Sequence, residues 1–146
     1  MKKLFSVIAI GSLLTVLVAA TARAQLPGTS IRASIPFDFV VRGRLLPAGN
    51  YEITRVADEP IGLVIRNVNH KRDEAVFETE PAYVSRESSK DVLVFHRYGA
   101  DYFLSEVVTA GEQTARELRP SHAERKLQRE MAKNQAEPET VTVALN

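Results

Sequence analysis

The distribution of aromatic residues constrains the fold of this chain more than any other feature. Six phenylalanines and four tyrosines occur among 146 residues, and apart from Phe5 all of them lie between Phe37 and Phe103. Within that stretch, short apolar and β-branched runs alternate with polar, glycine and proline turn residues. This pattern favours antiparallel sheet over helix-crossover architecture. We therefore expect the hydrophobic core between about residues 31 and 110.

The turn residues divide this stretch into short predicted strands. Pro47 has a fixed φ and Gly49 can adopt a positive φ, which predicts a reversal before Tyr51. Gly99 predicts a hairpin with a loop of either two or three residues. Asp38 alternates with Phe37 and Phe39, so we expect it to face solvent or to bind a turn; the alternative is a buried acid in a ligand pocket. The expected strands cover residues 31–41, 51–56, 62–67, 75–79, 82–85, 92–98 and 102–108.

The first residues have the pattern of a secretory signal peptide. Lys2 and Lys3 precede an apolar run, and Ala22-Arg23-Ala24 forms a small-residue cleavage site. We expect residues 1–24 to be removed after Ala24, which predicts an exported protein in the periplasm or outside the cell. A retained membrane anchor is the alternative, because the apolar run approaches the length that spans a bilayer.

Removal of the signal peptide changes the charge balance of the chain. The whole sequence carries a net charge of +1, and without Lys2, Lys3 and Arg23 it has 16 cations against 18 acids, a net charge of −2. This balance excludes a globally basic nucleic-acid-binding protein. The chain has no cysteine, so an exported form must fold by packing alone, without the disulfides on which small exported domains often depend.

The C-terminal part of the sequence predicts one helix. Residues 111–146 are richer in charge, and Pro120 disfavours helical geometry at the residue before it. Ser121 and Glu124 have the spacing of a capping box, in which the hydroxyl and the carboxylate each accept a hydrogen bond from a backbone N–H. We expect a helix over about residues 121–134, with an apolar stripe of Ala123, Leu127 and Met131. A flexible tail follows, although its alternating Val141, Val143 and Leu145 leave a late edge strand open.

These patterns together predict a mainly β protein with a signal peptide. We expect a small antiparallel β-sandwich or a partly open barrel over residues 25–110, followed by a charged extension with the C-terminal α-helix.

Three motifs resemble those of a family of uncharacterised exported bacterial proteins. They are IPFDFVV over residues 35–41, LPAGNY over residues 46–51 and RYGADYFLSEV over residues 97–107. Relatives carry an aromatic residue after the last motif, where this chain has Val108. No catalytic or binding residue is established for that family, so the resemblance implies an exported β domain and no site. The LPAGNY element also resembles the turn before a strand in transthyretin-like sandwich domains.

The histidines provide the alternative hypothesis of an enzyme. His70, His96 and His122 lack the spacing of a helical or strand metal pair. His96, Asp101 and Ser105 contain the residue types of a hydrolase triad, but no G-x-S-x-G elbow accompanies them. A small hydrolase or metal-dependent enzyme centred on His96 is therefore the alternative. The prediction is a non-enzymatic binding or envelope-associated domain with no cofactor, metal or catalytic residue.

The predicted helix carries the candidate binding site. Residues 119–133 contain five cations and two acids, although the chain without its signal peptide is acidic. Arg125, Arg129 and Lys133 are four residues apart on one face, where like charges slightly destabilise a helix. We favour the interpretation of a solvated face with cations favourably placed near the helix C-terminus. The alternative is an anion-binding face for lipid headgroups, a cell-wall polymer or another protein.

Overall fold

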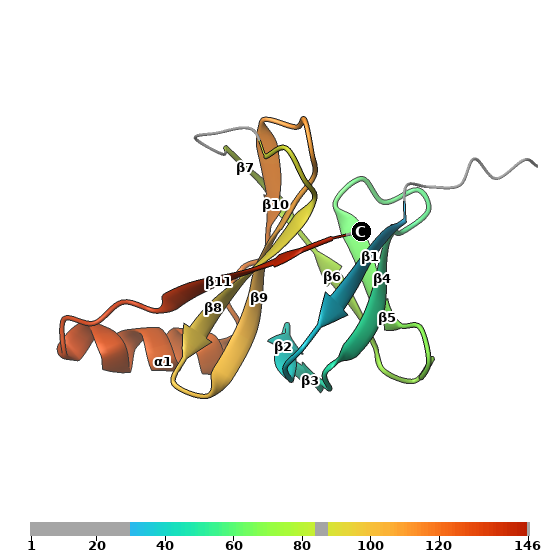
Figure 1. Ribbon diagram of the computed structural model, residues 1–146. Helices are drawn as coiled ribbons and strands as arrows, with labels where there is room; N and C mark the ends of the chain where they lie inside the picture. Colours follow the sequence, from blue (N-terminus) through green and yellow to red (C-terminus); the bar gives the residue numbers. More distant parts are fainter. Residues whose placement is uncertain (1–29, 84–87, 146) are drawn as a thin grey trace, which may run out of the picture.

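Two sheets and one helix form the part of the chain that the computed structural model describes, residues 30–83 and 88–145 (Figure 1). The predicted fold class, mainly β with a C-terminal helix, is confirmed, and within the described residues the sheets do not close into a barrel. The predicted signal peptide, residues 1–24, lies outside the described residues.

Antiparallel pairing builds both sheets. The first sheet has the strand order β1 (Ile31–Ile35), β4 (Gly49–Arg55), β5 (Gly62–Asn67), β6 (Glu74–Glu78). The second has the order β11 (Glu139–Ala144), β8 (Val92–Tyr98), β9 (Asp101–Val108), β10 (Thr114–Glu117), β7 (Glu80–Tyr83). A short hairpin of β2 (Phe39–Val41) and β3 (Arg44–Leu46) joins the second sheet through one parallel bridge between Val40 and Phe103.

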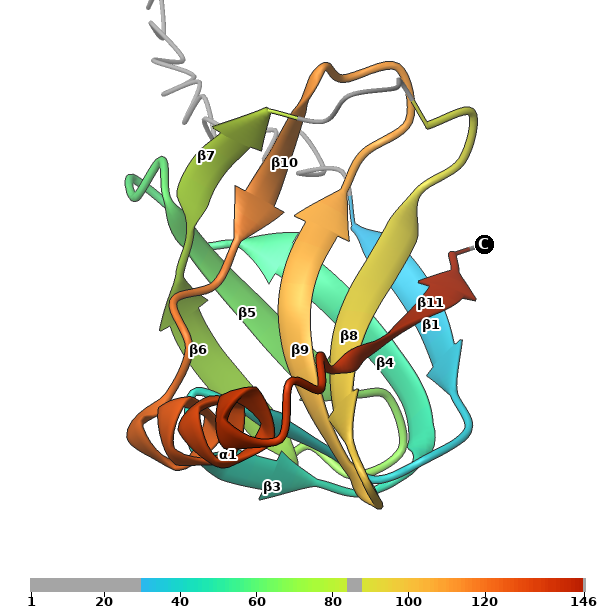
Figure 2. The same cartoon turned by 90° about the vertical axis from the view of Figure 1, so that its left-hand side faces the viewer.

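The chain passes directly from the first sheet to the second between β6 and β7. Thr79 lies at this point and is 2% exposed. Its backbone N–H and its hydroxyl both donate to the carbonyl of Ile61 at 2.9 Å. These bonds extend the β5–β6 pairing by one residue and hold the crossing point against the first sheet, and Figure 2 shows β1 and β11 approaching each other on the other side.

Aromatic side chains from both sheets meet in the core. Phe39 lies edge-on to Tyr51 of β4 and to Phe95 of β8, with ring centroids 5.1 and 5.5 Å away, and all three are 0% exposed. Edge-to-face pairs contribute about 0.5–1.5 kcal/mol beyond their buried area. The β2–β3 hairpin therefore supplies the ring that connects the two sheets.

The first predicted strand is two strands in the structure. Residues 36–38 interrupt the expected run 31–41, so β1 pairs in the first sheet and β2 in the second. Pro36 has no N–H for a ladder, and the exposed carboxylate of Asp38 accepts a hydrogen bond from Ala48 N at 2.8 Å. The predicted turn-binding role of Asp38 is thereby confirmed. The hairpin turn at Arg42-Gly43, with φ of 50° and 89°, was not predicted.

Gly49 has a different role from the expected one. It is not among the described residues with positive φ; instead a Cβ there would lie 2.8 Å from Asn67 Nδ2. Asn67 is 3% exposed, and its Oδ1 accepts from Asn69 N and His70 N. Glycine is needed at this position because a buried, hydrogen-bonded side chain occupies the space.

Segments beyond residue 110 complete the second sheet. Helix α1 (His122–Lys133) agrees with the expected range. The sequence predicted no strand at β10, which lies in the expected charged extension, and a flexible tail at β11. Residues 139–144 pair with β8 in the register Val141 opposite Phe95, and Leu145 is 8% exposed. The alternating apolar residues of the tail therefore bury one face of an edge strand, the alternative that the sequence left open.

Candidate functional site

Helix α1 lies on the face of the second sheet that points away from the first sheet (Figures 1 and 2). Its inward residues are Glu124, which is 5% exposed, and the half-buried Leu127, Gln128 and Met131. Ala123 is exposed, so the predicted stripe of Ala123, Leu127 and Met131 is wrong at its first position. A charged residue occupies the centre of the contact because it finds polar partners on the sheet.

The contact between helix and sheet is a cluster of five polar side chains, which we call the polar latch: His96, Tyr98, Ser105, Glu124 and Gln128. Glu124 Oε1 is 3.4 Å from the Tyr98 hydroxyl and 3.5 Å from His96 Nδ1. Gln128 Nε2 donates to the Tyr98 hydroxyl at 3.0 Å, and Ser105 Oγ is 3.4 Å from His96 Nε2. Each helix residue of the latch therefore contacts β8 through a side-chain polar atom.

A β-bulge places Ser105 in the latch. Val94 lies opposite Glu106, whereas the next residue, Phe95, lies opposite Leu104, so Ser105 is the extra residue of β9. Bulges redirect side chains in this way. The displaced Ser105 contacts His96 from the neighbouring strand.

Protonation of His96 strengthens the latch. Its Nδ1 is buried, and 3.5 Å to Glu124 is an ion-pair separation rather than a hydrogen bond. The contact with Glu124 raises the pKa of the imidazole above its ordinary value, burial opposes the rise, and Glu106 and Glu117 add to it. The charged imidazole is thus favoured where three carboxylates face it.

The latch brings together the residue types of a hydrolase triad, in the order Ser105, His96, Glu124. The expected acid was Asp101. Asp101 is exposed and pairs with Tyr98 across the Gly99 hairpin, and the carboxylate beside His96 belongs to Glu124. Ser105 is only 5% exposed, and its hydroxyl lies 3.4 Å from the His96 imidazole. The described residues also contain no group of three metal-ligating side chains.

The opposite face of α1 carries the predicted basic row. Arg125, Arg129 and Lys133 are all exposed. The Arg125 guanidinium donates to the carbonyl of Pro120 at 2.6 Å. Among the described residues, no carboxylate lies within ion-pair distance of any of the three cations. Within the described residues the row therefore has no carboxylate partner, and we call it the basic face.

Sequence reasoning missed the inward role of Glu124, Gln128 and Tyr98. A helical spacing was available as a signal, because residues 124, 127, 128 and 131 follow the i, i+3, i+4, i+7 pattern of a buried face. Because Glu124 and Gln128 are polar, this spacing was not recognised as a buried face.

Comparisons with protein-family models, curated proteins and solved structures found no match to this chain. No helix within residues 30–83 and 88–145 has the length and apolar character needed to cross a bilayer. The functional argument therefore rests on the contacts of the chain itself.

Proposed function

We propose that this protein is an exported, non-enzymatic β domain that associates with an anionic component of the cell envelope through the basic face of α1. Export follows from the signal-peptide pattern of residues 1–24, with cleavage after Ala24. The observation that carries the proposal is the exposed row of Arg125, Arg129 and Lys133 without carboxylate partners among the described residues.

The polar latch supports this proposal because it fixes the orientation of the helix. Glu124 and Gln128 contact the sheet on one side, while the basic residues project from the other. A row of like charges at i, i+4 spacing costs the helix some stability, and an anionic surface removes that cost. The ligand chemistry is an array of phosphate or carboxylate groups, in lipid headgroups or in a cell-wall polymer.

The expected association is weak and depends on salt. Each Lys or Arg near an anionic membrane contributes about 1 kcal/mol, so three contribute roughly 3 kcal/mol, less than the ~4.1 kcal/mol of a 1 mM Kd. The apolar contribution is small, since the half-buried Leu127 and Met131 face the sheet. Binding therefore requires a dense anionic surface and low ionic strength.

Co-sedimentation of the chain from Gln25 onward tests the proposal. Vesicles of phosphatidylglycerol, vesicles of phosphatidylcholine and anionic cell-wall fragments are compared at low and high salt. We expect sedimentation with at least one anionic surface, lost at high salt and lost in the variant Arg125→Gln/Arg129→Gln/Lys133→Gln. The two anionic arms distinguish lipid from polymer.

The matched control is Arg32→Gln/Lys71→Gln/Lys90→Gln, which removes three exposed cations from other parts of the surface. It has the same net charge as the basic-face variant and should sediment like the wild type. Equal sedimentation of all three proteins at low salt would refute a role for the basic face. Both variants should keep the wild-type melting curve, because the substituted side chains are exposed.

A further inference from the structure

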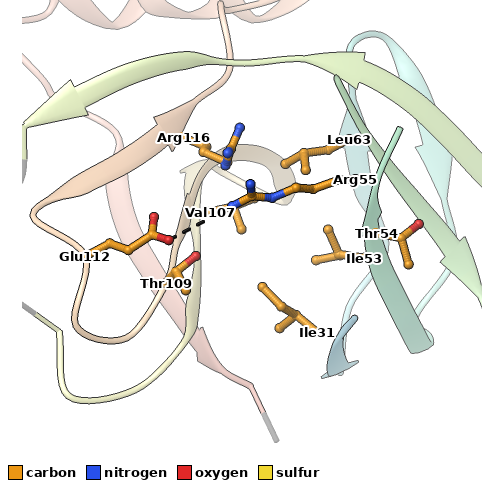
Figure 3. A pocket seen from close by; sticks show the side chains of 9 residues that line it. All are labelled: Ile31, Ile53, Thr54, Arg55, Leu63, Val107, Thr109, Glu112 and Arg116. Carbon is orange, nitrogen blue, oxygen red and sulfur yellow. Dashed lines mark ion pairs between the residues drawn. The ribbon is translucent and has the colours of Figure 1, made fainter. Parts of the chain in front are cut away.

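A small cavity lies between the two sheets, near the start of β1 and the end of β4 (Figure 3). Its volume is about 70 Å³. Since a water molecule needs about 10–15 Å³ of such a cavity, this space holds a group of a few heavy atoms. Its nine lining residues come from both sheets and from the connection between β9 and β10.

The inner wall of the cavity is apolar. Ile53 and Val107 are 2% exposed, Leu63 is 3% exposed, and the half-buried Ile31 packs against the same core. These four side chains come from β4, β9, β5 and β1. A short hydrocarbon chain would find only apolar partners on this wall.

Two guanidinium groups face this wall from opposite sheets. Figure 3 shows the Arg55 side chain reaching across the cavity toward Glu112, with the Arg116 guanidinium beside the end of Arg55. Arg55 Nη2 is 4.0 Å from Glu112 Oε1, and Arg116 Nη1 donates to the carbonyl of Pro60 at 3.0 Å. Among the described residues, no carboxylate lies within ion-pair distance of Arg116.

This arrangement leaves positive charge without compensation. Burial lowers the pKa of the Arg116 guanidinium, the neighbouring Arg55 lowers it further, and Glu112 opposes both. Two cations share one carboxylate: the Arg55 and Glu112 side chains are 57% and 42% exposed, and their 4.0 Å separation is at the outer limit of an ion pair. A second carboxylate between the guanidinium groups would complete the charge balance, and the planar fork of arginine matches carboxylate geometry.

We propose that this cavity binds the carboxylate of a short-chain aliphatic acid between Arg55 and Arg116, with its hydrocarbon chain against Ile31, Ile53, Leu63 and Val107. This site is independent of helix α1 and of the function proposed above. It is a second binding site, at the junction of the two sheets.

Methyl-detected NMR titration of the whole exported chain tests the site with acetate, butyrate and inorganic phosphate as probes. We expect saturable shifts at the methyl groups of Ile31, Leu63 and Val107, with butyrate binding more tightly than acetate. Arg55→Gln and Arg116→Gln should each weaken butyrate binding by about tenfold or more. Glu112→Gln should strengthen it several-fold, because it removes the carboxylate that competes for Arg55.

Arg32→Gln is the matched control, since it breaks an exposed ion pair with Glu52 on the same sheet and should leave the affinity unchanged. The proposal is overturned if phosphate binds as tightly as butyrate, or if Glu112→Gln leaves binding unchanged or weaker. It is equally overturned if butyrate shifts no cavity methyl group in the wild type. A lower Tm in Arg116→Gln would then mean that the arginines only hold the sheets together. If Arg116→Gln does not fold, Arg55→Gln and Glu112→Gln decide the question.

Discussion

The role of Glu124 in the structure differs from the role that the sequence predicts. In the sequence it is the acid of a capping box with Ser121. In the structure only half of that box forms, because Ser121 Oγ accepts from Glu124 N at 3.2 Å while the carboxylate faces Tyr98 and His96. The spacing of a capping box is local and predictable. The alternative partners lie on β8, far away in the sequence, so no local pattern could have indicated them.

The His96–Glu124 contact predicts a dependence of stability on pH. Because the folded state raises the pKa of His96, its stabilising contribution is fully present below the unfolded value near 6.5 and is lost as pH rises through the folded pKa. The free energy of unfolding should therefore fall as the pH rises from the unfolded value near 6.5 through the higher folded pKa, by no more than about 1.4 kcal/mol per pH unit for one proton. Urea denaturation at several pH values measures it.

The variant His96→Gln isolates this contribution. It should flatten the pH dependence in that window, whereas His122→Gln, at the exposed first residue of α1, should not. Burial also raises the pKa of Glu106, so the contribution of His96 is taken from the difference between the wild-type and His96→Gln profiles. Parallel pH profiles for the wild type and His96→Gln would contradict the prediction.

Among the elements, locally determined features were predictable and sheet assignments were not. The start of α1 follows from Pro120 and Ser121, and the break at Gly99 follows from its position between two aromatic runs. The structure adds that the hairpin loop has two residues, with Tyr98 opposite Asp101. By contrast, the assignment of β1 and β2 to different sheets depends on contacts with β4 and β9, which strand periodicity does not encode.

Two glycines are expected to respond differently to alanine. Gly99 has a φ of 65°, and the space around it is open, since nothing lies within 4 Å of the position that a Cβ would take there. Gly99→Ala should therefore cost about 1–2 kcal/mol, the backbone cost of a left-handed residue. Gly49→Ala instead displaces buried Asn67, so it should also disturb the turn after β5. Denaturant melts give the costs, and amide shifts of Asn69 and His70 report the turn; unchanged shifts in Gly49→Ala would contradict this interpretation.

At the scale of the whole molecule, the three motifs over residues 35–41, 46–51 and 97–107 form one packed unit. Phe37 and Tyr102 stack with centroids 3.9 Å apart, Asp38 binds Ala48 N, and Tyr51 packs against Phe39. In this chain their contacts are therefore structural. The cavity arginines were not predicted, because Arg55 and Arg116 become neighbours only when both sheets form.

Truncation of the central rings should destabilise the whole domain. Phe39 and Phe95 are both 0% exposed and in contact with each other, so replacement of either by alanine should cost about 3–5 kcal/mol. Val76→Ala is the control, since Val76 is 66% exposed on an edge strand, and it should be nearly neutral. Near-neutral melts for both phenylalanine variants would show that the core lies elsewhere.

The position of β11 at the edge of the second sheet bears on how the chain matures during synthesis. A ribosome or a translocation channel releases residues in order, at about 5–20 residues per second during synthesis. Strand β11 follows every other element along the chain, yet it covers β8, which carries Phe95. Until it arrives, β8 has an unpaired edge open to other chains. The nascent protein thus exposes this edge, a template for pairing with other chains, until residues 139–144 emerge.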